Sequence, residues 1–335
     1  MNLWKRLLPL ALALTLLAGC APAGNADIPD ESDENIYTDR VELVEVDIDI
    51  EDEAVAMSDA PAALSTVLLP EASGVNVQKN SRAQIDYSNI KDGYVMVKCS
   101  STGKKLKVQV FGPSYSVNNT KYTYNLNGDE WTTFPLSDGN GSYKVSVYEN
   151  TSGNSYASLL TASFNVTLTD EFAPFLRPNQ YVDYASAPKT VAKAAELAGS
   201  ETDALKLVEI VYGYVVKNLS YDKQLAATVK SGYLPVLDDV LAKKTGICFD
   251  YASLMTGMLR SLGVPCKLVV GYAGKSYHAW INVWSEETGW ITGAIHFNGS
   301  AWERMDPTFA SSGNQSSSIM KYIGDGKNYN PMYLY

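Results

Sequence analysis

The chain has 335 residues, a length that predicts two domains rather than one. Its net charge of −10 is unevenly distributed, because residues 27–53 hold 13 acidic side chains and a single basic one, Arg40. Without that segment and the two basic residues near the N-terminus, 24 acidic and 24 basic side chains remain. The acidity therefore says nothing about substrate charge, and no basic patch suggests a nucleic-acid partner.

The first residues have the features of an export signal. Lys5 and Arg6 precede an apolar stretch, residues 7–17, which is too short to span a membrane as a mature helix. A Leu-Ala-Gly-Cys sequence that ends at Cys20 resembles a bacterial lipobox. The resemblance implies removal of residues 1–19 and lipidation of Cys20, which would anchor the protein on the extracytoplasmic face of a membrane. The alternative is an ordinary signal peptide in which Cys20 is incidental.

Two further segments precede the part of the chain that carries reactive residues. Residues 20–64 are expected to form a disordered acidic tether, because their charge density favours solvated chain even where residues 41–50 alternate like a strand. Residues 81–169 are predicted to form an immunoglobulin-like β-sandwich. Short alternating segments separated by Gly- and Asn-containing turns support this fold, and its usual size is about 90 residues. Cys99 is expected to point inward as a small apolar side chain.

Residues 171–335 are predicted to form an α+β domain. Helical periodicity covers residues 188–197, 201–217 and 237–244, and a longer helix opens at Cys248 and runs to about Leu262. Strands are expected at residues 266–272 and 279–285, followed by a pair around an Asn298-Gly299 turn. Helices followed by antiparallel strands are typical of the α+β class.

Cys248 is the residue in this domain with the most evident chemical potential. A helix N-terminus presents unpaired N–H groups, which lower the pKa of a thiol, although Cys248 alone could equally be a buried structural cysteine. A thiolate nucleophile needs a nearby base and a group that orients the base. His278 at the start of one strand and Asp306 after another are suitable, but order and spacing alone do not prove that they meet.

Three short motifs resemble those of the transglutaminase-like superfamily. They are Gly246-x-Cys248, His278-Ala279-Trp280 and Asp306-Pro307-Thr308. His278 follows Cys248 by 30 positions, and Asp306 follows His278 by 28. Residues 218–222 resemble the segment before that family's active-site helix, and the resemblance covers about half of the chain. It implies a papain-like core in which Cys248 is the nucleophile, His278 the general base and acid, and Asp306 the residue that orients His278.

The implied reaction begins with attack of Cys248 on a carboxamide or peptide carbonyl to form a thioester. Transfer to an amine would be crosslinking, and transfer to water would be deamidation or proteolysis. The expected partner is a protein or cell-wall peptide substrate, no cofactor is expected, and we expect a monomer. The alternative is a non-catalytic surface lipoprotein that binds through the β-sandwich and the transglutaminase-like scaffold.

The remaining candidates have weaker assignments. Tyr221 is either a core residue or a second oxyanion donor beside the Cys248 backbone N–H, and Trp280 is a packing residue that could also form a wall of the cleft. Asp250 is expected to complement the helix N-terminus, and His296 to lie at the surface. Cys266 is expected to be buried, and a Cys248–Cys266 disulfide is disfavoured because a nucleophile must be a thiol. No metal site is expected, because the Cys and His residues lack paired ligand spacing.

Overall fold

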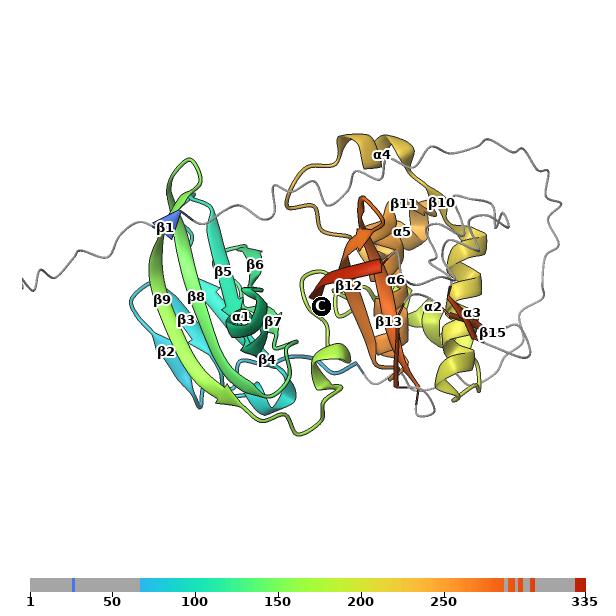
Figure 1. Cartoon of the computed structure of the whole chain (residues 1–335), viewed down its shortest axis with the longest axis horizontal. Coiled ribbons are helices and arrows are strands. Elements are labelled where there is room, and N and C mark those ends of the chain that lie inside the picture. The colour runs from blue at the N-terminus through green and yellow to red at the C-terminus, as the bar shows by residue number, and fades with distance from the viewer. Residues whose placement is uncertain (1–25, 28–66, 286–288, 293–294, 298–301, 305–328) are drawn as a thin grey trace, which may run out of the picture.

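The computed structural model describes residues 26–27, 67–285, 289–292, 295–297, 302–304 and 329–335. Figure 1 shows two modules side by side along the long axis of the molecule. The first consists of strands drawn in blue to green, and the second combines helices with strands drawn in orange and red.

The first module contains two antiparallel sheets. The five-stranded sheet has the order β1 (Ala26–Asp27), β9 (Ser155–Val166), β8 (Gly141–Ser152), β5 (Leu106–Phe111) and β6 (Tyr122–Leu126). The four-stranded sheet has the order β2 (Val77–Lys79), β3 (Ala83–Asp86), β4 (Tyr94–Cys99) and β7 (Thr132–Pro135). Strand β6 is thus an edge strand, and within the described ranges its backbone pairs only with β5.

The alternating sequence segments of this module form strands β4, β5, β6, β8 and β9 as expected, and Cys99 is fully buried. Apolar side chains from both sheets share one core, which includes Val97, Val108 and Val147. The immunoglobulin-like assignment and the domain boundaries stay predictions. Within the expected tether, the backbone of Ala26 and Asp27 pairs with Tyr156 and Ser155 and forms the short strand β1.

The helices of the second module precede its main sheet. They are α2 (Pro188–Ala198), α3 (Ala204–Asn218), α4 (Lys223–Thr228), α5 (Leu237–Lys243) and α6 (Cys248–Ser261), and a short helix α1 (Pro113–Asn118) lies in the first module. All fourteen residues of α6 are buried, which makes it the central element of the module. The predicted α2, α3, α5 and α6 are confirmed, and Gly263 after α6 has the positive φ of +80° expected of a helix C-terminus.

A four-stranded antiparallel sheet packs against α6. Its order is β14 (Gly289–Thr292), β13 (Ser276–Ser285), β12 (Cys266–Ala273) and β17 (Tyr329–Leu334). Two small ladders complete the module, namely β10 (Ser220–Tyr221) with β11 (Thr245–Gly246) and β15 (Ile295–Phe297) with β16 (Trp302–Arg304). The predicted α+β architecture is therefore confirmed.

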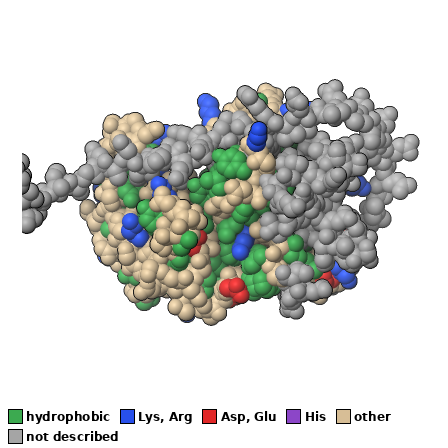
Figure 2. Space-filling view, viewed as in Figure 1, with side chains coloured by type: hydrophobic (Ala, Val, Ile, Leu, Met, Phe, Trp, Pro, Cys, Tyr) green, Lys and Arg blue, Asp and Glu red, His purple; other side chains and the backbone are tan. Residues whose placement is uncertain are grey.

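A set of tyrosines joins the two modules, and we call it the tyrosine seam: Tyr122, Tyr124, Tyr181, Tyr333 and Tyr335. The ring centroids of Tyr122 and Tyr335 lie 5.7 Å apart, those of Tyr124 and Tyr181 5.6 Å, and those of Tyr181 and Tyr335 4.6 Å. On the face shown in Figure 2, hydrophobic side chains gather near the middle of the molecule, where the modules meet. Within the described ranges, no helix combines the length and apolarity needed to cross a bilayer.

Candidate active site

Cys248 is the first residue of α6, and its side chain has no exposed surface. The chain enters the helix from β11, and Ile247 occupies the N-cap position with an extended backbone. The first N–H groups of a helix have no partner within it, and they carry the positive end of the helix dipole. The sequence-predicted position of Cys248 at a helix tip is therefore confirmed.

Asp250 closes the same helix tip. Its Oδ2 accepts a hydrogen bond of 2.8 Å from the Ile247 backbone N–H, which is the reciprocal half of a capping box, since an Ile side chain has no acceptor to supply the other half. Gly246 makes this possible: a Cβ at that position would lie 2.6 Å from the Asp250 Cβ. The capping role expected for Asp250 is confirmed.

The second carboxylate oxygen of Asp250 binds a side chain from a preceding loop. Oδ1 accepts a hydrogen bond of 2.7 Å from the Tyr233 hydroxyl. Burial raises the pKa of Asp250 to about 6, although the bonds from Ile247 and Tyr233 oppose that rise. The helix tip therefore holds a carboxylate that gains its negative charge near neutral pH, two residues from Cys248.

His278 lies on β13, the strand that packs against α6, and its side chain also has no exposed surface. Its cross-strand partner on β12 is Gly271. The register of the β12–β17 pair shifts between Val270 and Gly271, and a Cβ on Gly271 would lie 2.2 Å from the Asn330 carbonyl oxygen. Such bulges often lie next to active sites, where they aim side chains.

Trp280 is a packing residue in this structure. It shares a face of β13 with His278, since residues two apart in a strand point the same way, and the two rings stack with centroids 6.3 Å apart. Its other neighbour is Tyr329 of β17, at 5.1 Å in an edge-to-face arrangement. Trp280 is fully buried and therefore fixes the ring next to His278.

Tyr221 lies close to the helix tip through the backbone. Its strand β10 runs parallel to β11, so that Tyr221 is level with Gly246. The next residue, Asp222, donates its backbone N–H to the Gly246 carbonyl at 2.9 Å. The Tyr221 side chain is partly buried, and the oxyanion role stays a proposal.

The other cysteines are structural. Neither Cys99, Cys248 nor Cys266 forms a disulfide, so the Cys248–Cys266 alternative is excluded. Cys266 is fully buried, its thiol donates to the Thr256 hydroxyl, and burial raises its pKa to about 11. Among the described residues, no three His, Cys, Asp or Glu side chains cluster as metal ligands.

Three predicted residues lie wholly or partly outside the described residues. Asp306, the predicted orienting residue, comes two positions after the end of β16 and is outside them, as is Cys20. The backbone of His296 is described in β15, paired with Glu303, but its side chain is not. The structure therefore brings the elements of Cys248 and His278 together and leaves the third triad member a prediction.

Arg260, at the other end of α6, has a structural role that the sequence does not reveal. Its fully buried guanidinium donates to three backbone carbonyls, those of Cys266 at 2.9 Å, Arg177 at 2.7 Å and Tyr335 at 2.6 Å. Burial lowers its pKa to about 10. A basic residue in the last turn of a helix is usually a surface residue, so no sequence signal marks this role.

The tyrosine seam reaches the candidate site directly. The rings of Tyr181 and Phe249 lie 5.6 Å apart, and Phe249 is the residue after Cys248. Tyr181 also contacts Tyr124 of the first module. The helix tip is consequently in contact with the junction between the modules.

Comparison with known proteins supports the assignment of the second module. The model of the family described as the transglutaminase-like superfamily matches residues 191–293, which include Cys248 and His278 and end before Asp306. A protein-glutamine gamma-glutamyltransferase of Pseudomonas aeruginosa is 28% identical over 120 residues, 31% of this chain and 18% of that protein. The uncharacterized protein YebA of Bacillus subtilis is 26% identical over 127 residues, 32% of this chain and 17% of that protein. The chain thus matches less than a fifth of the length of these curated relatives.

Solved structures with detectable similarity are distant. A candidate cysteine protease from Cytophaga hutchinsonii has a TM-score of 0.37 and 16% identity, covering 78% of this chain and 74% of that one. The periplasmic domain of TgpA from Pseudomonas aeruginosa, bound to ethylmercury, has a TM-score of 0.33 and 17% identity, covering 76% and 80%.

Proposed function

We propose that the transglutaminase-like domain, whose family model matches residues 191–293, makes this chain a cysteine-dependent acyltransferase or peptidase that acts on protein or cell-wall peptide. The observation that carries the proposal is the placement of Cys248 and His278. Cys248 opens α6, His278 lies on the strand that packs against α6, and both side chains are buried. A nucleophile and a base on rigid, facing elements are what this chemistry requires.

The proposed reaction has two steps. Cys248 gives its thiol proton to His278, and its Sγ bonds to the carbonyl carbon of a carboxamide or peptide. The C–N bond breaks, and the leaving nitrogen takes that proton from His278. An amine or a water molecule then gives a proton to His278 and bonds to the thioester carbon, the C–S bond breaks, and the Cys248 sulfur takes the proton back from His278. Asp306 would orient His278, and the Cys248 backbone N–H, with Tyr221, would stabilise the oxyanion. The two acceptors lead to crosslinking or to deamidation and peptide hydrolysis.

We further propose that the protein works outside the cytoplasm, anchored through lipidated Cys20. The support is the sequence alone, namely the basic residues, the short apolar stretch and the Leu-Ala-Gly-Cys sequence at the N-terminus. Incorporation of a labelled fatty acid that disappears in Cys20→Ala, together with loss of membrane association, tests this anchor.

The catalytic proposal is tested by alkylation and by product analysis. Cys248 is expected to react with iodoacetamide near neutral pH faster than an ordinary thiol once the site opens. Cys266 is the matched control, because it is equally buried and its pKa is raised, and it is expected to stay unmodified. Mass spectrometry of glutamine- and lysine-containing peptides should then show ammonia loss with crosslinking, deamidation or cleavage. A product that is formed equally by Cys248→Ala would remove the support for catalysis.

The second candidate function is non-catalytic binding by a surface lipoprotein. The observation that favours it is the complete burial of Cys248 and His278, since a substrate can reach the sulfur only after neighbouring chain moves. Binding of surface peptides that is unchanged in Cys248→Ala, without any product from the wild type, would favour this function.

A further inference from the structure

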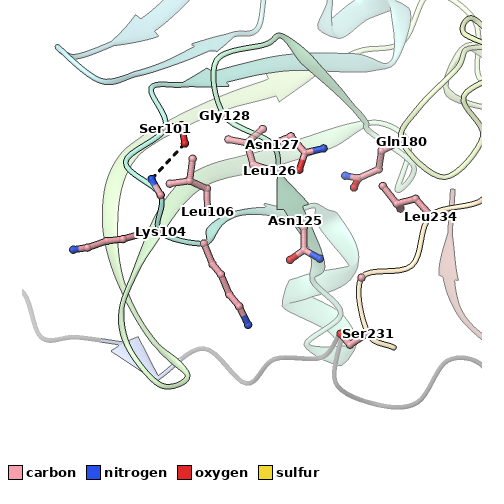
Figure 3. A pocket seen from close by; sticks show the side chains of 13 residues that line it. Ser101, Lys104, Leu106, Asn125, Leu126, Asn127, Gly128, Gln180, Ser231 and Leu234 are labelled. Carbon is pink, nitrogen blue, oxygen red and sulfur yellow. Dashed lines mark hydrogen bonds between the residues drawn. The ribbon is translucent and has the colours of Figure 1, made fainter. Parts of the chain in front are cut away.

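A polar groove of about 650 Å³ lies between the first module and a loop of the second. One wall is the end of the edge strand β6 and the turn that follows it, with Asn125 and Asn127. The other wall carries Gln180, Gly232 and Leu234. Figure 3 shows Asn125, Leu126 and Asn127 on one side, with Gln180 and Leu234 opposite.

The lining side chains favour hydrogen bonding to a ligand. Within the described ranges, the side-chain amides of Asn125, Asn127 and Gln180 have no hydrogen-bond partner, and the Nε2 of Gln180 is buried without one. A buried polar group without a partner is costly, so a ligand that supplies an acceptor at Gln180 is favoured. The groove therefore offers three carboxamides to a ligand, of which those of Asn125 and Asn127 are exposed to solvent.

The charge of the groove is one-sided. Lys104 and Lys105 line it, both exposed, and among the described residues no acidic side chain does so. In the described part of the chain, the acidic neighbour of the Lys104 Nζ is Glu149 at 3.9 Å, and Glu149 is already bound by Arg82 at 2.6 Å. This arrangement is complementary to a ligand with negative side chains.

The end of β6, where Asn125 and Leu126 line the groove, adds a second recognition element. An edge strand presents unpaired N–H and C=O groups, and an extended peptide can pair with them as an additional strand. By contrast, none of the described lining residues is aromatic, so this lining offers no ring that could stack on a sugar. The chemistry favours a polypeptide over a glycan.

The groove is connected to the candidate active site at two points. Tyr233, between the lining residues Gly232 and Leu234, donates its hydroxyl to Asp250 at the tip of α6. Tyr181, next to Gln180, contacts Phe249, the neighbour of Cys248. A ligand in the groove consequently lies against segments that also contact the nucleophile's helix.

We propose that this groove binds an extended acidic segment of the polypeptide substrate, which pairs with the outer edge of β6 and places its side chains against Lys104 and Lys105. The inference rests on the proposed function, because it assigns the substrate class of the same domain. It adds that the substrate is recognised at the junction between the modules, away from the carboxamide or peptide bond that reacts.

The test uses the full chain with Cys248→Ala, so that binding is measured without turnover. The probe is a fluorescein-labelled ten-residue peptide of alternating Val and Glu, followed by fluorescence anisotropy at low salt. Lys104→Glu/Lys105→Glu is expected to weaken binding at least tenfold, and Asn127→Asp to weaken it without altering the charge of either lysine. The control Lys79→Glu/Lys91→Glu makes the same charge change at exposed positions of the first module outside the groove and is expected to bind as before.

Strand pairing is tested with the same peptide N-methylated at alternate residues, which blocks backbone donors on one edge and is expected to abolish binding. Three results would overturn the proposal. The methylated peptide could bind as well as the unmodified one, the groove and control lysine variants could lose the same amount of affinity, or oligogalacturonate could bind in place of the peptide. Peptide binding that is detected only after Glu42, Glu45, Asp47 and Asp49 are neutralised would also overturn it, because the occupant would then be the chain's own acidic segment.

The two proposals fail separately. Peptide binding without any Cys248-dependent product would count against the proposed catalysis and leave the groove a binding site. A Cys248-dependent product with no peptide binding would overturn the groove alone.

Discussion

Asp250 offers the sharpest test of how the helix tip is built. Its carboxyl is buried, and its pKa is raised from 3.8 to about 6. Between these two values the folded protein binds more protons than the unfolded chain, so the free energy of unfolding falls as pH rises from about 4 to 6 and levels off above. The difference in pKa corresponds to a loss of about 3 kcal/mol across that interval.

Asp250→Asn removes the titration while preserving the shape of the side chain. The amide keeps an acceptor oxygen for the Ile247 N–H, and its NH2 group can donate to the Tyr233 hydroxyl oxygen in place of the bond that this hydroxyl donates in the wild type. At pH 4.5, where the wild-type carboxyl is mostly protonated, the two proteins are therefore expected to have similar free energies of unfolding. At pH 7.5 the variant is expected to be the more stable of the two, because the wild type then carries a buried charge.

Tyr233→Phe provides the matched control. It keeps the carboxylate but removes the hydrogen bond that lowers the pKa of Asp250, so the decline in stability with pH is expected to persist and to end at higher pH. Urea denaturation of all three proteins between pH 4 and 8 measures the effect. If wild type and Asp250→Asn lose stability in parallel over that range, the assignment of a buried, titrating Asp250 is refuted.

Three further changes test other parts of the fold. Arg260→Met is expected to lower the free energy of unfolding by about 3 kcal/mol or more, because three backbone oxygens lose their donor and two of these hydrogen bonds are buried. A change within about 0.5 kcal/mol in urea denaturation would contradict this. Gly246→Ala should lower the free energy of unfolding by about 1–3 kcal/mol in the same assay, because the added Cβ displaces Asp250. Gly213 lies in a helix with open space where a Cβ would be added, so Gly213→Ala should be neutral or stabilising. Equal effects of the two substitutions would refute the close contact between residue 246 and Asp250. Burial lowers the pKa of Lys267 to about 8, below its ordinary value, so the free energy of unfolding should rise with pH between about 8 and 10. Lys267→Met should abolish that rise in urea denaturation, and a rise of the same size in the variant would contradict the assignment.

Local patterns were sufficient to predict the helix of Cys248 and the strand of His278. The apolar periodicity and the glycine after Leu262 located α6, and alternation located β12 and β13. Strands β2, β3 and β7 were not predicted, because three or four residues are too few to show an alternation of apolar and polar side chains. Helix α4 was missed as well, although Asp222 supplies a recognisable cap by accepting from the Leu225 N–H.

The long-range contacts of the site had no sequence signal. Asp250 meets Tyr233 across 17 residues of chain, and Arg260 meets carbonyls 83 and 75 residues away. Such partners are set by tertiary packing, which composition and periodicity do not encode. The resemblance to a known family predicted Cys248, His278 and Asp306 as a triad, and their catalytic roles stay predictions.

The complete burial of α6 has a kinetic consequence. Amide protons in a helix with no solvent-facing side exchange with water only through large openings, so α6 is expected to be among the slowest-exchanging segments of the protein. Under the proposed function, its first residue would have to meet a substrate from solvent. Access to Cys248 would then come from movement of the residues around the helix tip and not from fraying of the helix. Deuterium uptake that is fast at Tyr233 and Tyr181 but slow along α6 would describe a fixed nucleophile whose surroundings open.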